Sequence, residues 1–212
     1  MSTKQDNNKY QNRTPPFESG LTRRDFLKQS GAATLIAGLL ISKPCVSMSF
    51  FQGEDKTNKS HPNNSEKFSD SQKTILKAVQ LQLFPADGDG PSASEINALP
   101  YLEWALTDPK NREDGDREFI ISGLAWLESF TKETMNKSFV QLSNTQQHKL
   151  LTQFSKTKKH ENWMSILVYY LIEALLLDPV YGGNPNGIGW KWLEHQPGFP
   201  RPKKGKTYRE LS

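Results

Sequence analysis

The chain has 212 residues, of which 27 are Lys or Arg and 23 are Asp or Glu, so its formal net charge is +4. Residues 1–47 hold seven of the basic and three of the acidic residues, which leaves 20 of each sign in the remainder. A nucleic-acid-binding domain keeps its basic excess in the folded part, because phosphate contacts supply most of the affinity. The charge balance therefore excludes nucleic acid as a partner.

The sequence TRRDFLK near the N-terminus matches the twin-arginine export pattern [ST]-R-R-x-F-L-K. All six defined positions fit: Thr22, Arg23, Arg24, Phe26, Leu27 and Lys28. The apolar segment 31–42 that follows is shorter than the ~20 residues needed to span a bilayer, and a basic stretch precedes it, as in a signal peptide. We predict that residues 1–47 are a twin-arginine signal peptide, that the translocase is a transient partner, and that the mature protein is periplasmic.

The alternatives to this export signal are an amphipathic helix with a chance arginine pair, and lipid attachment at Cys45. Cleavage is expected near Ser47, since Cys45 and Ser47 supply small residues at the key positions. Cys45 is the single cysteine of the chain, so the exported protein is expected to have no disulfide.

Residues 48–65 are rich in Asn, Lys, Ser and Gly, with too few apolar residues to offset chain entropy, and are predicted to be a flexible linker. Residues 66–177 suit one helical domain. Ser69 followed by Gln72 is a capping-box pattern that opens a helix expected to end at Phe84-Pro85. Ser92 and Glu95 repeat the pattern, but Pro100 should kink or restart the next helix, so either one helix or two short segments can follow.

Three more helices are predicted from apolar residues at helical spacing. The third spans about 116–135, the fourth begins at the Ser143 and Gln146 capping pair, and the fifth spans 163–177. The fifth is apolar nearly all round apart from Glu173, which suggests burial on several sides. After it, residues 178–212 are rich in Gly and Pro and show no periodicity. The predicted fold is all-α, a small helical bundle with a long irregular C-terminal tail.

The sequence contains no glycine-rich loop that would bind a nucleotide and no Cys motif that would bind haem or an iron–sulfur cluster. The four histidines lie in unrelated segments without ligand spacing. Two acidic clusters, 87–90 and 114–118, fail the calcium-loop pattern at the positions where ligands are required. We therefore predict no catalytic, cofactor-binding or metal-binding residue in this chain, and place any cofactor of the exported assembly elsewhere.

The tail contains one distinctive segment, DPVYGGN, with a Gly-Trp pair after it. Its glycines permit turns at positive φ, and its aromatic residues either pack on the bundle or anchor a partner, because Tyr and Trp are enriched at interfaces. We hypothesise a partner interface made by Asp178, Tyr181, Gly182, Gly183, Asn184 and Trp190.

Several segments together resemble the subunit 3 family of gluconate 2-dehydrogenase. They are Leu83-Phe84-Pro85-Ala86-Asp87, Gly90-Pro91, Glu95, Gly123-Leu124, Phe139, Leu142-Ser143, Gln146-Gln147, DPVYGGN at 178–184, Gly189-Trp190 and Pro197-Gly198. The resemblance covers about residues 70–200, and DPVYGGN with its Gly-Trp pair is the most specific part. Pro100 departs from the family pattern, and so does Glu194-His195-Gln196, where the family more often has Gly and Tyr.

The resemblance implies a small subunit that pairs with a large FAD-binding oxidoreductase of the glucose-methanol-choline type. That partner oxidises a sugar or sugar acid, and a multihaem c-type cytochrome subunit often takes the electrons. One leader would then export both the chain and its FAD-loaded partner. Two alternatives stay open: a free-standing periplasmic helical interaction or binding protein, and an enzyme whose site one sequence does not reveal.

Overall fold

The computed structural model describes residues 23–24, 27–28 and 67–210. The linker predicted at 48–65 and the cleavage position near Ser47 lie outside the described residues. The all-α prediction is confirmed: within the described part the only β pairing is an isolated bridge between Lys203 and Lys206. The α-helices are α2 (Asp70–Leu83), α3 (Ala98–Ala105), α4 (Pro109–Glu113), α5 (Asp116–Met135), α6 (Asn144–Phe154), α7 (Lys158–Leu176) and α8 (Ile188–Leu193). Four short 3₁₀ turns accompany them: η1 (Phe139–Gln141), η2 (Pro179–Tyr181), η3 (Pro185–Gly187) and η4 (Tyr208–Glu210).

The capping pairs start helices where the sequence predicted. Ser69 accepts a hydrogen bond from the backbone of Gln72, whose side chain accepts one from the backbone of Ser69, and α2 begins at the next residue. The same reciprocal pair, Ser143 with Gln146, opens α6. Helix α7 begins earlier than predicted, at Lys158, because Thr157 caps it by accepting from the backbone N–H of His160.

The residues around Pro100 form a turn followed by one helix. The Glu95 carboxylate accepts from the backbone and the hydroxyl of Ser92, at 2.8 and 2.7 Å, and holds a turn there. Asn97 then adopts a left-handed conformation with φ of 56°, and α3 starts at Ala98. Pro100 therefore lies in the first turn of α3, where its missing N–H leaves no intrahelical bond unmade.

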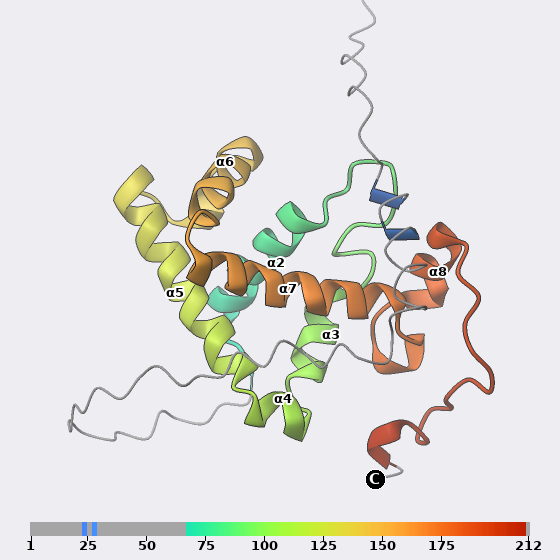
Figure 1. Ribbon diagram of the computed structural model, residues 1–212. Coiled ribbons are helices and arrows are strands. Elements are labelled where there is room, and N and C mark those ends of the chain that lie inside the picture. The colour runs from blue at the N-terminus through green and yellow to red at the C-terminus, as the bar shows by residue number, and fades with distance from the viewer. Residues whose placement is uncertain (1–22, 25–26, 29–66, 211–212) are drawn as a thin grey trace, which may run out of the picture.

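Helix α7 runs through the middle of the bundle, with α5 crossing one end and α3 and α8 packed toward the other (Figure 1). It buries one broad face, formed by Trp163, Leu167, Tyr170, Leu171, Ala174 and Leu175. The expected burial on several sides is correct only in part, since Val168, Tyr169 and Leu176 remain exposed. None of the helices that the structure describes is both long and apolar enough to cross a bilayer.

The crossing of α5 and α7 depends on a glycine. Trp163 is fully buried, and its indole N–H donates to the carbonyl of Ile120 at 3.1 Å. A Cβ on Gly123 would lie 1.9 Å from the Trp163 indole nitrogen, well inside van der Waals contact. Gly123 thus provides the space into which the largest core side chain packs.

Replacing Gly123 by Ala should destabilise the fold although Ala is the better helix former. Overpacking of this kind typically costs about 1–3 kcal/mol, which exceeds the gain of ~1 kcal/mol in helix propensity. The matched control is Ser122→Ala, one residue earlier on the exposed side of α5. Denaturant unfolding of the purified chain measures both; Gly123→Ala as stable as the parent would refute the packing assignment.

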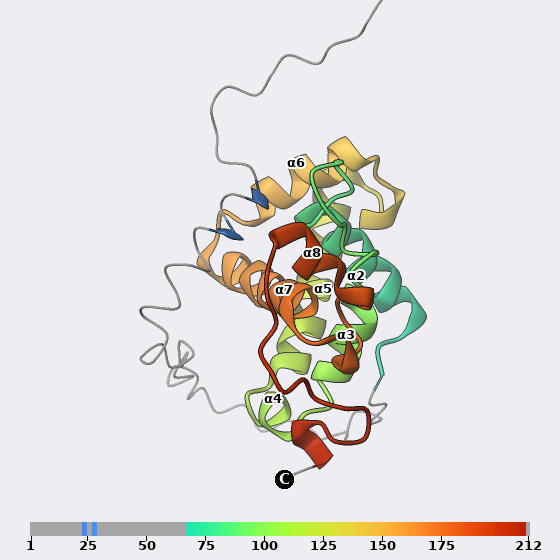
Figure 2. The same cartoon turned by 90° about the vertical axis from the view of Figure 1, so that its right-hand side faces the viewer.

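The tail packs against the bundle and is more helical than predicted. It contains η2, η3, α8 and η4, and from α8 it descends to α4 along one side of the molecule (Figure 2). At its end the Tyr208 hydroxyl donates to Asp108 at 2.8 Å, and the guanidinium of Arg209 lies 3.9 Å from the ring centroid of Trp104. The predicted irregularity is correct for the residues between α8 and η4 and wrong for α8 itself.

Candidate functional site

Two segments that are far apart in sequence form one surface, which we call the loop–tail junction: residues 84–97 after α2 and residues 178–195 after α7. The backbone N–H of Asn184 donates to the carbonyl of Ile96 at 3.1 Å. The indole N–H of Trp192 donates to the carbonyl of Asp89 at 2.7 Å, and its ring meets Phe84 edge to face with centroids 6.1 Å apart. Two of the regions that carry the family resemblance therefore form one structural unit.

Asn184 joins the parts of this junction. It is fully buried in a left-handed conformation with φ of 48°. Its amide nitrogen donates to the carbonyl of Leu177 at the end of α7, at 3.2 Å. Its amide oxygen accepts from the backbone of Gly189 in α8, at 2.7 Å. Asparagine suits this position because it tolerates positive φ and satisfies a donor and an acceptor at once.

Substitution of Asn184 by Ala should cost about 3 kcal/mol, because it leaves a buried carbonyl and a buried N–H unpaired and places Ala at positive φ. Asn186 is the matched control: it also has positive φ, 55°, but is exposed, so Asn186→Ala should cost only about 1 kcal/mol. Thermal unfolding of the two variants tests the difference. Equal losses would show that the Asn184 amide bonds contribute little.

The remaining residues of the hypothesised partner interface divide between the interior and the surface. Gly183 is buried, and a Cβ there would lie 2.6 Å from the carbonyl oxygen of Ala174. Trp190 is 8% exposed and donates to the carbonyl of Leu176 at 2.6 Å. Gly183, Asn184 and Trp190 hold the tail against α7. The accessible residues of the hypothesised interface are therefore the exposed Gly182 and the half-buried Tyr181.

Asp178 fixes the start of the tail through charge. Its carboxylate accepts from the backbone of Val180 at 3.0 Å and from the guanidinium of Arg201 at 2.7 Å. Burial alone would raise the pKa of Asp178, but the hydrogen bonds from Arg201 and Val180 outweigh it and hold the pKa below its ordinary value. The carboxylate therefore stays ionised and paired at neutral pH.

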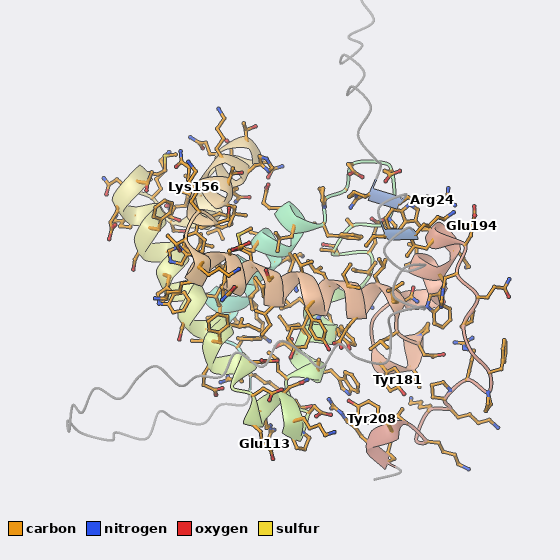
Figure 3. All side chains as sticks on the ribbon, in the orientation of Figure 1. Arg24, Glu113, Lys156, Tyr181, Glu194 and Tyr208 are labelled. Atoms are coloured by element: carbon orange, nitrogen blue, oxygen red, sulfur yellow. The ribbon has the colours of Figure 1, made fainter. Side chains whose placement is uncertain are left out.

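At the edge of the junction lie three tyrosines that we call the tyrosine patch: Tyr181 and Tyr208, whose rings are in contact, and Tyr169 of α7, which interacts electrostatically with Tyr208. Tyr169 is 46% exposed and Tyr208 is 52% exposed. Tyr181 packs between Trp104 and Tyr208, with ring centroids 5.4 and 5.8 Å apart, and Figure 3 shows Tyr181 and Tyr208 next to each other. Exposed tyrosines gathered in this way are typical of protein interfaces.

The buried phenols below this patch are hydrogen-bond donors. Burial, together with the Glu173 carboxylate, raises the pKa of Tyr101, and burial with Asp116 raises the pKa of Tyr170. The Tyr101 hydroxyl donates to Glu173 at 3.0 Å, and that of Tyr170 donates to Asp116 at 2.5 Å. Both phenols therefore stay neutral at physiological pH and connect α7 to α3 and α5.

Residues 67–210, together with the described residues 23–24 and 27–28, contain no group of three or more His, Cys, Asp or Glu side chains placed to hold a metal ion. The acidic segment 87–90, which begins like a calcium loop, makes hydrogen bonds within the loop and to α8. Asp87 accepts from the backbone of Asp89 at 3.1 Å, and Asp89 presents its carbonyl to Trp192.

Four of the six predicted export residues are described, and they lie against the loop–tail junction; Thr22 and Phe26 lie outside the described residues. Arg23 pairs with Asp87 at 2.5 Å, while Arg24 and Lys28 pair with Glu194 at 2.5 and 2.8 Å. Leu27 packs on the core. Sequence reasoning did not predict this surface. Phe84 and Asp87 lie far in sequence from Trp192 and Glu194, and no local pattern relates the two pairs.

The family model described as gluconate 2-dehydrogenase subunit 3 matches residues 70–198. The chain belongs to this family. The matched range begins with α2 and ends just beyond α8, so it contains both segments of the loop–tail junction. No curated protein and no solved structure matches the chain. As a subunit 3 protein, the chain is a component of a multi-subunit dehydrogenase, and the resemblance read from its motifs is confirmed.

Proposed function

We propose that this chain is the non-catalytic small subunit of a periplasmic, FAD-dependent dehydrogenase of gluconate or a related sugar. In this proposal it escorts a folded flavoprotein of the glucose-methanol-choline type through twin-arginine export and stabilises it afterwards. The observation that carries the proposal is the combination in one chain of the subunit 3 family match over 70–198 with a full twin-arginine pattern at residues 22–28.

The redox chemistry is assigned to the partners. FAD would be held by the large subunit, and haem by a c-type cytochrome subunit where one is present. In the domain, two carboxylates with lowered pKa values stabilise the fold: Asp178 pairs with Arg201, and Asp108 binds Tyr208 and Arg209. This use of charge supports a binding subunit over an enzyme.

The tyrosine patch is the surface best suited to the flavoprotein. It is continuous with the exposed end of the DPVYGGN segment at Tyr181 and Gly182, the part of the hypothesised interface that remains accessible. On the same side of α7 as Tyr169, two turns along the helix, the exposed Leu176 adds apolar area. Large aromatic anchors surrounded by smaller apolar contacts are the usual arrangement of a binding hot spot.

Replacing Arg23-Arg24 by Lys-Lys should leave both this chain and the flavoprotein in the cytoplasm, because one leader serves two subunits. Subcellular fractionation with antibodies against each subunit is the measurement. Parallel retention of both subunits is expected. Export of the flavoprotein in cells where this chain is retained would contradict a shared signal.

Tyr169→Ala should weaken the complex without unfolding the subunit, because the ring is nearly half exposed in the isolated chain. An aromatic anchor worth about 2 kcal/mol corresponds to a roughly 30-fold loss of affinity. Val140→Ala is the control, since Val140 is 39% exposed but lies in η1, away from the patch. Titration of each variant against the purified flavoprotein measures affinity; equal affinities for both variants would remove Tyr169 from the interface.

A further inference from the structure

The twin-arginine motif is bound by the folded domain of its own chain. Each of its three described cations meets a carboxylate: Arg23 meets Asp87, and Arg24 and Lys28 share Glu194, with all three pairs between 2.5 and 2.8 Å. The two carboxylates come from opposite segments of the loop–tail junction, and Figure 3 shows Arg24 beside Glu194 at the end of α8. The binding surface therefore exists only when the domain is folded.

Aromatic rings complete the site for Arg23. Its guanidinium carbon lies 4.7 Å from the ring centroid of Phe84 and 5.6 Å from that of Trp192, within the range of a cation–π interaction. The Arg23 side chain is 24% exposed and that of Arg24 is 34% exposed. Both arginines are thus largely withdrawn from solvent.

The receiving surface is rigid. Trp192 is fixed by its bond to the Asp89 carbonyl and lies against Gly90, where a Cβ would come within 2.2 Å of the indole. Glu194 has φ of 54° at the end of α8, a conformation that favours Gly or Asn. A glutamate stands here although the local backbone preference opposes it, and its carboxylate binds two cations of the leader.

We propose that the loop–tail junction is a binding site for the twin-arginine motif of this chain, and that it competes with the translocase for Arg23 and Arg24. This inference rests on the proposed function for its export consequence, while the binding itself does not. Bonds from Lys28 and Arg24 hold the pKa of Glu194 below its ordinary value, so the site keeps its negative charge at neutral pH.

Weak contacts are sufficient for such a site. A single exposed ion pair contributes little, but here three pairs and a cation–π contact act together on one short segment. The segment is also covalently tethered to its site, and a tether commonly gives an effective concentration on the order of a millimolar. An interaction with a dissociation constant of roughly 0.1 mM would then be about nine-tenths occupied, which still leaves the leader available to a tighter receptor.

The test compares the reactivity of individual arginines in the full-length precursor. A dicarbonyl reagent modifies guanidinium groups, and mass spectrometry of the digested product gives the rate at each arginine in the native and in the denatured chain. We expect Arg23 and Arg24 to react about tenfold more slowly in the native precursor than in the denatured chain. The same native rates are then measured in the variant carrying Asp87→Asn and Glu194→Asn.

In that variant the native rates at Arg23 and Arg24 should approach those of the denatured chain. Asn keeps the acceptor that Asp87 offers to the Asp89 backbone and suits the positive φ of residue 194, so the melting temperature should not fall. Glu113→Gln, an exposed acid far from the leader (Figure 3), is the control and should leave the protection intact. Absence of protection in the wild type, or equal protection in the variant, would overturn the site.

The second readout is export of the chain expressed without its partner. Release of the motif in the double variant should speed its export relative to the wild type, and equal export with released arginines would overturn the competition. The Lys-Lys variant separates the two proposals, because lysines can still pair with Asp87 and Glu194. If Lys-Lys is exported normally, the twin-arginine function fails, while the protection measured at the native arginines still decides the binding site.

Discussion

The arrangement of the functional surface depends on one buried amide. Asn184 joins the carbonyl of Leu177 at the end of α7, the first turn of α8 and the backbone before α3, and so links three elements of the fold through one side chain and its backbone. Together with the bond from Trp190 to Leu176, these bonds hold α8 against the loop after α2, where Trp192 reaches the Asp89 carbonyl. The conformation at positive φ and the demand for both a donor and an acceptor restrict the position to Asn, which accounts for the form of the DPVYGGN segment.

Through that constraint the domain presents two surfaces with different chemistry. On one side the tyrosine patch is apolar and aromatic, the type of surface that binds a partner through desolvation. On the other, Phe84, Trp192, Asp87 and Glu194 form an acidic, aromatic surface that suits a guanidinium group. Both surfaces include residues of the tail after α7, Tyr181 and Tyr208 in one and Trp192 and Glu194 in the other, so the tyrosine patch and the surface that binds Arg23, Arg24 and Lys28 share one structural support.

Sequence reasoning predicted most of the helices because their signals are local. The reciprocal Ser–Gln caps, the apolar spacing of α5 and the stop at Phe84-Pro85 each involve residues within a few positions of one another. Helix α8 was missed because it is short and begins among Gly and Asn residues that indicate turns. The start of α3 was ambiguous, since only the positive φ of Asn97 separates the preceding turn from the helix.

The site was harder to predict because its contacts are tertiary. The DPVYGGN segment was singled out correctly as distinctive, but its pattern does not reveal that Asn184 and Trp190 point into the domain. Gly123 looked like one element of a family resemblance, and only the position of Trp163 explains it. The carboxylates that pair with Arg23, Arg24 and Lys28 belong to Asp87 and Glu194. These two residues lie far apart in sequence, so no spacing rule relates them.

We propose that this chain carries an FAD-loaded partner to the translocase, and the state of the precursor before export tests this role most directly. The precursor should be isolated from cells that lack the translocase, under native conditions, and its associated protein and flavin measured. We expect the precursor to elute with a large flavoprotein and with stoichiometric FAD. A precursor that elutes alone, while the flavoprotein and its FAD elute elsewhere, would contradict the escort role.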